Sequence, residues 1–302
     1  MLPVMKTFRV STEIYKSPAR VWEILTTTKG MAHWFSETAA HDAKPGGMMR
    51  YRGNFVFGWR EGLEFETKLT AYEPEKKFGF EFPLYLRDGR VLRGDVLFEL
   101  EPLGGHTRLT FTHHIESPTT EPPYYLNDLW GYYLNVLTNT CEHDYSEPGL
   151  LFDFTRTWKG NIKHVIYINA NPDPIFRALH DPDWLKKYFT EVKIFEPQEE
   201  GRIDFGWGNE GPRRVLIWDP PAELTYDWPV LHDGDIHLGK VTWQLEPEGR
   251  QTRVTMKQSG FNAEVDHFRT GEALGWAAIM LDLKRVLESG RPALNQSGAY
   301  VE

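Results

Sequence analysis

GEALGWAAIMLDLKRVLESG, residues 271–290, has the spacing of a single long amphipathic α-helix. Its large apolar residues recur at positions i, i+4, i+7 and i+11, which lie on one face of a helix. These residues are Trp276, Met280, Leu283 and Leu287. An apolar face of this kind needs a surface to cover it, so we expect the preceding part of the chain to supply strands that form one.

The same helix occurs a second time, earlier in the chain. The stretch LNDLWGYYLNVLTNTCEH, residues 126–143, has the same spacing, and Glu142 within it matches Glu288. Its apolar residues, each 146 positions before its counterpart, are Trp130, Leu134, Leu137 and Cys141. Because the helix recurs, we expect the strands that cover it to recur as well, one set for each helix.

The segments that precede each helix repeat as well. Residues 6–15 alternate apolar and polar side chains, which predicts a half-buried strand with Phe8, Val10, Thr12 and Ile14 on its inner face. A short helix follows, with Ser17 as its N-cap, Pro18 in its first turn and Gly30 at its end. The second half matches this segment at a shift of 154, through Ile168, Pro172, Ile175, Phe176, Leu179, Tyr188 and Phe189.

Hairpins complete each copy. Residues 48–72 predict two strands around a turn near Gly58–Gly62, and the second half has a shorter equivalent whose turn lies in GWGNEGP, residues 206–212. A later hairpin in each copy has its turn at Asp88-Gly89 or at Asp233-Gly234, dipeptides that favour two-residue hairpin loops. Its first strand alternates with period two, through Phe78, Phe80 and Phe82 in one copy and Leu224, Tyr226 and Trp228 in the other.

The chain is therefore predicted to have an α+β fold made by duplication of a whole domain. Each copy consists of a strand, a short helical segment, about six antiparallel strands and a long helix, so that a curved sheet wraps around the C-terminal helix of each domain. The predicted domains are residues 1–145 and 159–302, with a linker at about 146–158. The apolar residues of that linker are expected to pack against one or both domains.

Composition limits the classes of partner. The net charge of −9 and the absence of a basic run argue against nucleic acid and against anionic membranes. No apolar run reaches the roughly 20 residues of a membrane span, and MLPVMKTFRV has no signal-peptide pattern, so we expect a cytoplasmic protein. The single cysteine, Cys141, lies on the apolar helix face and is expected to be a buried, inert thiol.

The order of these elements resembles a known superfamily. The Pro-x-x-φ-[WF] opening of the short helix, its [WY]-F ending and the GW…LE…G helix are similar to the START-like helix-grip fold, also called SRPBCC, and within it to AHSA1-like domains related to the activator of Hsp90 ATPase. The resemblance covers about residues 6–143 and 160–290 and implies the fold described above. Members of this superfamily include lipid carriers, hormone receptors and polyketide cyclases, so the resemblance implies no single function. The Hsp90 activator has a separate N-terminal domain that engages the chaperone, and the first copy here begins by residue 6, which argues against a chaperone partner.

Strand parity places a few polar residues on the concave face of the second sheet. They are His164, Arg213, His237 and Gln258, whereas His113 is nearly alone in the first domain. One interpretation is a polar cluster that orients the polar end of a ligand within an apolar pocket. The other, which we favour, is that the two histidines are solvated near strand ends and that Arg213 belongs to a turn.

Aromatic residues also line the predicted inner faces. They are Tyr51, Phe80, Phe98 and Trp130 in the first copy and Trp207, Trp228, Trp243 and Trp276 in the second. Core packing is the simpler interpretation, and the wall of a ligand cavity is the more specific one. His113 and His114 are adjacent on a strand and face opposite sides, so they cannot bind one metal ion. No motif for a cofactor, a metal or a catalytic nucleophile occurs, and none is predicted.

Three hypotheses for the function remain open. The first is a non-enzymatic protein that binds a small apolar or amphipathic ligand. The second is an enzyme of the cyclase or hydrolase kind, in which His164 or His237 moves protons in the second domain. The third is a chaperone-regulating factor, which rests on the family name alone. Two histidines, or a histidine and a carboxylate, within hydrogen-bonding reach of one cavity would favour the enzyme.

Overall fold

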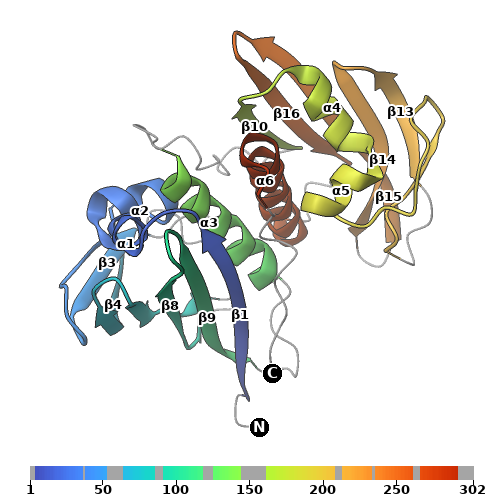
Figure 1. Ribbon diagram of the computed structural model, residues 1–302. Helices are drawn as coiled ribbons and strands as arrows, with labels where there is room; N and C mark the ends of the chain where they lie inside the picture. Colours follow the sequence, from blue (N-terminus) through green and yellow to red (C-terminus); the bar gives the residue numbers. More distant parts are fainter. Residues whose placement is uncertain are drawn as a thin grey trace. The chain divides into compact units, whose positions relative to one another are not determined.

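The computed structural model describes residues 4–36, 38–52, 64–85, 91–117, 125–143, 161–207, 213–232, 235–260 and 266–291 (Figure 1). They fall into two compact units, one within residues 1–151 and one within 152–296. Each unit combines an antiparallel sheet with a long helix that follows the sheet in sequence (Figure 1). The predicted α+β fold with two tandem helix-grip domains is confirmed.

Among its described residues, the first domain forms a seven-stranded antiparallel sheet in the order β1-β9-β8-β5-β4-β3-β2. The strands are β1 Val4–Ile14, β2 Ala40–His41, β3 Met48–Arg52, β4 Glu64–Glu73, β5 Lys77–Glu81, β8 Gly94–Pro102 and β9 Thr107–Ser117, and β6 Leu84–Tyr85 with β7 Val91–Leu92 forms a small separate pair. The helices are α1 Pro18–Thr26, α2 Thr28–Trp34 and α3 Tyr125–Glu142.

The described part of the second domain has the same strand order, β10-β16-β15-β14-β13-β12-β11. Its strands are β10 Ile162–Ile168, β11 Ile194–Phe195, β12 Arg202–Asp204, β13 Arg213–Asp219, β14 Glu223–His232, β15 Asp235–Glu248 and β16 Gln251–Ser259. Its helices are α4 Pro172–His180, α5 Pro182–Tyr188 and α6 Asp266–Ser289. The identical order of pairing means that the sequence repeat is also a repeat of topology.

The long helices bury the apolar face that their spacing predicts. In α3, the side chains of Trp130, Leu134, Leu137 and Cys141 are all buried, and in α6 so are Trp276, Met280 and Leu283. Strand β1 likewise turns Phe8, Val10 and Ile14 inward. The thiol of Cys141 has a raised pKa because it is buried, which agrees with the predicted inert cysteine.

The prediction that Gly30 ends a single short helix is wrong. Two short helices occur, α1 and α2, and Gly30 lies inside α2. Thr27 separates them, because its extended backbone ends α1 while its hydroxyl accepts a hydrogen bond from the Gly30 amide, 3.0 Å away. A Cβ atom at Gly30 would lie 2.4 Å from the carbonyl oxygen of Ile24, so the glycine allows α2 to pack closely on α1. Ser17 and Pro18 occupy the predicted N-cap and first turn.

The repeat extends to individual hydrogen bonds inside each domain. The indole N–H of Trp34 donates to the carbonyl oxygen of Ile24 at 3.1 Å, and the hydroxyl of Tyr188 donates to that of Ala178 at 3.0 Å. Both pairs are related by the shift of 154. Each bond joins the second short helix to the first through a buried ring, so different aromatic residues perform the same structural role.

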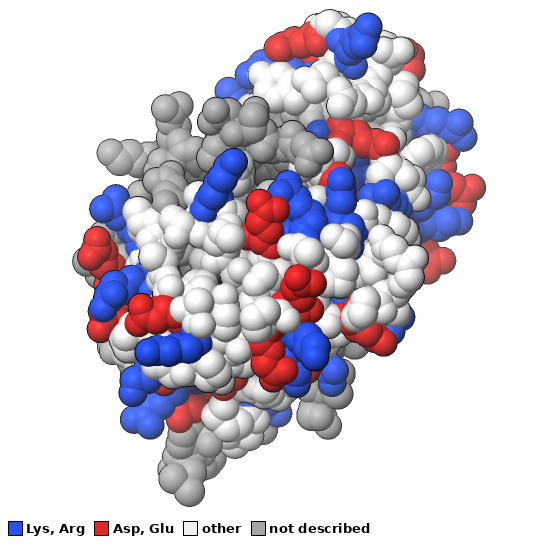
Figure 2. Space-filling model, turned by 60° about the vertical axis from the view of Figure 1, so that its left-hand side comes forward, with Lys and Arg blue, Asp and Glu red and all other residues white. Residues whose placement is uncertain are grey.

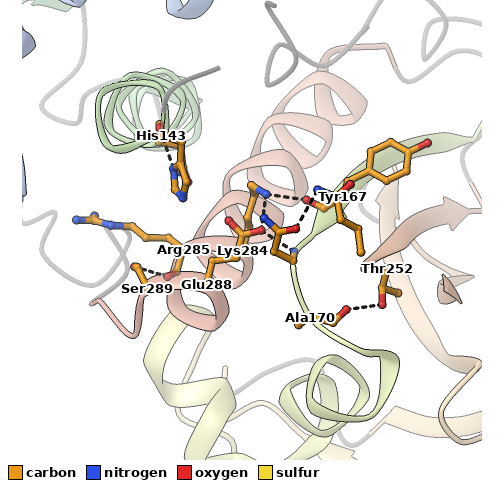
Figure 3. Close-up of polar contacts among 11 residues, drawn as sticks. His143, Tyr167, Ala170, Thr252, Lys284, Arg285, Glu288 and Ser289 are labelled. Carbon is orange, nitrogen blue, oxygen red and sulfur yellow. Dashed lines mark hydrogen bonds and ion pairs between the residues drawn. The ribbon is translucent and has the colours of Figure 1, made fainter. Parts of the chain in front are cut away.

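The long helix of each domain is fixed to the end of its first strand. Glu142 of α3 accepts a hydrogen bond from the backbone amide of Tyr15 at 3.0 Å, and Glu288 of α6 accepts one from Asn169 at 2.7 Å. Figure 3 shows the second case, with Lys284 of α6 beside Glu288 and near Tyr167. The match between Glu142 and Glu288 in the sequence therefore corresponds to a shared tether.

Several sequence predictions concern residues that the structure does not describe. They are the turns at Gly58–Gly62, Asp88-Gly89 and Asp233-Gly234, most of GWGNEGP, the linker at 146–158 and the tail after Arg291.

Acidic and basic side chains are interspersed on the described surface that Figure 2 shows. None of the helices, within the described residues, is both long enough and apolar enough to cross a membrane.

Candidate functional site

The polar residues predicted to face inward in the second domain lie toward one end of its sheet. The register places Gln258 of β16 between Val241 of β15 and Ile162 of β10, and it pairs Trp228 of β14 with Gly239. The N-terminal half of α6 covers this end, because the Trp276 ring lies 4.9 Å from that of Trp228 between centroids. The candidate site is this end of the interior, between the sheet and the first turns of α6.

Gln258 links the sheet to α6 through two side chains. Its Oε1 accepts a hydrogen bond from the indole N–H of Trp276 at 2.6 Å, and its Nε2 donates to the carboxylate of Glu272. An indole can only donate and a carboxylate can only accept, so the two partners fix the orientation of the amide. Gln258 is fully buried, and both bonds compensate for its desolvation.

Arg213 lies at the beginning of β13 with its guanidinium among aromatic rings. Its Cζ is 4.5 Å from the ring centroid of Trp228, 5.1 Å from that of Phe205 and 5.3 Å from that of Trp207. Only 3% of Arg213 is exposed. The favourable interaction of a cation with ring faces offsets part of the cost of burying this charge.

Tyr226 and Trp243 form a second polar contact on the same inner surface. The indole N–H of Trp243 donates to the hydroxyl oxygen of Tyr226 at 3.2 Å. Burial raises the pKa of the Tyr226 hydroxyl, so it stays protonated at neutral pH. Because the hydroxyl accepts the hydrogen bond from Trp243, its own proton can be donated in another direction.

His164 contacts the helix backbone. Its Nε2 lies 2.8 Å from the carbonyl oxygen of Ala273 in α6, so Nε2 carries the proton and donates it. Burial lowers the pKa of His164 to about 4, and the imidazole is therefore neutral at pH 7. Its exposed fraction is 2%, which shows that the interpretation of a solvated histidine is wrong for this residue.

The equivalent end of the first domain is lined mainly by hydrocarbon rings. The ring of Trp130 lies 4.2 Å from that of Phe111 and 5.2 Å from that of Phe82, between centroids. Its indole N–H donates to Nδ1 of His113 at 3.0 Å, so His113 takes the place of Gln258. Burial lowers the pKa of His113 to about 3 and keeps it neutral. His114 faces the other side of β9 and contacts Asp95, as the parity of the strand predicts.

The structure brings together most of the residues that the sequence suggested for the second domain. Arg213 touches Trp228, Trp228 touches Trp276, and Trp276 binds Gln258 and lies 5.8 Å from Trp243 between ring centroids. In the first domain the suggested residues Tyr51, Phe80, Phe98 and Trp130 are all buried, and Phe80 packs against Tyr51.

Two suggested residues of the second domain differ from the rest. Trp207 is 42% exposed, so it lies at the rim beside Phe205 rather than fully inside. His237 belongs to β15, but its side chain lies outside the described residues. Arg213 begins a strand and is buried, so its assignment to a turn is wrong.

Sequence reasoning missed Tyr226 and Glu272 as site residues. The period-two alternation through Leu224, Tyr226 and Trp228 contained the signal for Tyr226, because it places all three on one face. Glu272 lies four residues before Trp276, and hence on the same side of a helix, but the predicted apolar stripe did not include it. Its contact with Gln258 depends on how far α6 extends toward its N-terminus.

The chemistry available at this end is recognition of polar groups within an aromatic enclosure. It provides a buried cation at Arg213, a hydroxyl donor at Tyr226 and a carboxylate at Glu272. Within the described residues, no group of three or more His, Cys, Asp or Glu is arranged to hold a metal ion. These features define a tandem helix-grip protein whose two interiors differ in polarity.

The chain belongs to the family described as activator of Hsp90 ATPase homolog 1-like protein. The family model matches residues 16–142 and 169–288, which together exceed half of the chain and fall in both domains. No curated protein sequence matches the chain. The suspected tandem AHSA1-like domains are therefore confirmed.

Similar solved structures include single-domain and longer proteins. The Aha1 dimer of Colwellia psychrerythraea is 28% identical and covers 43% of this chain and 98% of its own, with a TM-score of 0.38. MLL2253 of Mesorhizobium loti is 26% identical, with the same two coverages and the same TM-score. DynU16, a protein in the dynemicin biosynthetic locus, is 18% identical and covers 95% of this chain and 99% of its own, with a TM-score of 0.35.

Proposed function

We propose that this protein binds a small apolar or amphipathic molecule, and that the second domain holds it. The observation that carries the proposal is that two buried polar side chains, Arg213 and Gln258, contact aromatic rings at one end of that domain. Ligand sites in proteins are typically apolar enclosures with a few polar groups that fix the orientation of the ligand.

The first domain supports this proposal because it serves as an internal control. It has Val10 and Thr67 where the second domain has His164 and Arg213, and it builds the same strand order. The fold therefore does not require an imidazole or a charged group at these positions. Burying a charged group costs stability, so its presence in one copy alone favours a role in binding.

The contacts of His164 favour a binding protein over an enzyme. A histidine that transfers protons needs a pKa near the working pH. The Nε2–H of His164 is instead donated to the backbone carbonyl of Ala273, and its lowered pKa keeps it neutral. The described contacts of His164 thus favour a structural role.

The proposal is tested with the full-length chain and neutral aromatic probes of one to three rings, led by 2-naphthamide. We expect native mass spectrometry and calorimetry to detect one bound probe per chain. Trp228→Ala should weaken binding at least tenfold, whereas the matched change in the first domain, Phe82→Ala, should leave it unchanged. Folding of both variants is checked by circular dichroism.

Two results would overturn the proposal. One is that no probe binds the wild-type chain and that no small molecule is retained when the protein is purified. The other is that Phe82→Ala abolishes binding while Trp228→Ala preserves it, which would move the ligand to the first domain.

A further inference from the structure

Tyr226 of β14 has a buried hydroxyl group that accepts a hydrogen bond but donates none within the described part of the chain. Its oxygen accepts from the indole N–H of Trp243 at 3.2 Å. Only 3% of Tyr226 is exposed, and no acceptor among the described residues takes its proton. A buried O–H group without an acceptor loses its hydration without compensation. An acceptor supplied by another molecule would restore the missing hydrogen bond.

The strand register fixes this side chain on the inner face of the second sheet. Tyr226 pairs with Val241 of β15, so Trp243, two residues further along β15, is its diagonal neighbour on the same face. The Tyr226 ring lies 6.2 Å from that of Trp228 and 5.9 Å from that of Phe205, between centroids. The donor therefore belongs to a residue that lies among the aromatic rings of the candidate site.

The first domain lacks both members of this polar pair. Phe80 and Phe98 occupy the positions of Tyr226 and Trp243, and both are fully buried in the equivalent strands. Two phenylalanines thus build the same part of the fold, so folding requires neither the hydroxyl nor the indole N–H. The presence of both groups in the second domain favours a role in recognition.

The contact with Trp243 determines what the hydroxyl can bind. A hydroxyl oxygen that accepts a hydrogen bond becomes a stronger donor, because linked hydrogen bonds polarise one another. Burial raises the pKa of Tyr226, so the group is a neutral donor rather than a phenolate. One neutral donor is sufficient for a carbonyl oxygen, whereas a carboxylate needs several hydrogen bonds to compensate for its lost hydration.

We infer that the Tyr226 hydroxyl donates a hydrogen bond to the carbonyl oxygen of a flat aromatic ligand, an aryl carbonyl compound such as a ketone, in the second domain. This inference rests on the proposed function and specifies its ligand class. The aromatic body contacts the rings of Trp228 and Phe205 and contributes most of the affinity. The hydroxyl selects ligands that carry the acceptor, and Trp243 acts as a positioning residue that holds the hydroxyl oxygen.

The test compares two probes of the same shape by calorimetry with the full-length chain. They are 2-acetonaphthone and 2-isopropenylnaphthalene, in which a CH₂ group replaces the carbonyl oxygen. The measured quantity is the affinity for the ketone divided by the affinity for the alkene. In Tyr226→Phe this ratio should fall at least fivefold from the wild-type value, with the loss confined to the ketone, because its carbonyl is then buried without a donor.

Tyr188→Phe is the matched control. Tyr188 is another buried tyrosine of the second domain, and its hydroxyl already donates to the carbonyl oxygen of Ala178 at 3.0 Å. The variant removes the same single oxygen atom and should lower the free energy of unfolding, but it should keep the wild-type affinity ratio. An equal fall of the ratio in both variants would indicate a general loss of stability and overturn the inference.

Infrared spectroscopy gives a second readout. A hydrogen bond to a carbonyl oxygen lowers its stretching frequency. The ketone labelled with ¹³C at its carbonyl should therefore show a lower frequency when bound to the wild type than when dissolved in hexane. In Tyr226→Phe the frequency should return toward the value in hexane.

The possible outcomes separate this inference from the proposed function. An unchanged affinity ratio in Tyr226→Phe, a bound carbonyl with the frequency found in hexane, or binding of the alkene but not of the ketone overturns the inference and leaves the proposed function standing. Absence of binding by 2-naphthamide, the ketone and the alkene overturns both. If Tyr226→Phe fails to fold, the wild-type spectrum decides the question alone.

Discussion

The two domains of this protein are alike at one end and different at the other. At the end where the first strand leads into the short helices, both copies keep a threonine and a helix glutamate, namely Thr107 and Thr252, and Glu142 and Glu288. Both threonines donate to a backbone carbonyl, at 2.8 Å and 2.7 Å. Figure 3 shows this contact for Thr252 and Ala170.

Toward the opposite end, the same framework carries different chemistry. Phe82, His113 and Thr67 of the first domain correspond to Trp228, Gln258 and Arg213 of the second. The contrast indicates that backbone contacts at one end secure the fold, so the inner surface at the other end can vary. Each matched pair therefore supplies its own control, and the following experiments use this property.

The largest effect is expected from Trp130→Ala and Trp276→Ala. Each removes a buried ring from the interior of one domain and a hydrogen-bond donor from His113 or Gln258. Truncation of a buried tryptophan costs about 3–5 kcal/mol, so each should destabilise its own domain by that amount in chemical denaturation. Only Trp276→Ala should also abolish binding of 2-naphthamide.

Trp184→Ala is the control for this pair. Trp184 is partly exposed on α5, where Lys187 lies over its ring, so its loss should cost less than about 1 kcal/mol. Loss of probe binding in Trp130→Ala would contradict the division of roles between the two domains.

The next largest effect is expected from Gly47→Ala and Gly201→Ala. A Cβ atom would lie 2.3 Å from the carbonyl oxygen of Asp42 in the first case and 2.2 Å from that of Glu196 in the second. The backbone must shift to relieve either contact, at a cost of about 1–3 kcal/mol per domain. Thermal unfolding should show similar losses, and a loss in only one variant would show that the two turns are not equivalent.

The sequence was sufficient to predict the strands, the long helices and which of their faces are buried. Periodicities of two and 3.6 residues are direct consequences of backbone geometry. They therefore placed His113 and His114 on opposite faces of one strand, and Trp130 and Trp276 on the buried faces of their helices. Their repetition in two copies strengthened each assignment. The division of the short helical segment at Thr27 was missed, because Gly30 was taken as a stop signal rather than as a close-packing residue.

The site could be predicted only in part, and the reason is physical. Parity shows which side a residue faces but not which residues of α6 meet it, because that depends on where the helix begins and how it is rotated. For this reason the contact between Glu272 and Gln258 was not foreseen. Likewise, the position of Arg213 at a strand end permitted either a solvated or a buried side chain.

A smaller loss of stability is expected when the pH is lowered from 7 to 5. Burial lowers the pKa of His113 to about 3 and that of His164 to about 4, below the ordinary value of 6.5. Below pH 6.5 the unfolded chain binds protons at these two histidines, whereas the folded domains do not. The contribution of each histidine to the free energy of unfolding is therefore present above pH 6.5 and is lost as the pH falls below it. The loss between pH 6.5 and pH 5 is about 2 kcal/mol per histidine.

The comparison of domains supplies the control for this prediction as well. His113→Gln and His164→Val give each domain the residue of the other copy, and each should flatten the pH dependence of its own domain in denaturation measured from pH 7 to pH 5. His180, whose pKa burial also lowers, leaves a residual slope in the second domain. An unchanged slope in His113→Gln would show that His113 is not the group responsible.

The smallest effect is expected at Lys284, which has no counterpart in the first domain. Its ammonium donates to Glu288 at 2.6 Å and to the carbonyl oxygen of Tyr167 at 2.7 Å (Figure 3). The first domain has Thr138 at the position equivalent to Lys284. Lys284→Thr removes both bonds but leaves Glu288 bonded to the amide of Asn169, as Glu142 is to that of Tyr15. Because the first domain holds its helix without a lysine, the loss should be only about 1 kcal/mol in the second domain. Glu288→Gln should cost more, since it leaves the nearly buried Lys284 ammonium without its counter-ion, whereas the carboxylate that remains in Lys284→Thr still accepts a hydrogen bond from the amide of Asn169. Equal losses in the two variants would mean that the tether depends on the lysine after all.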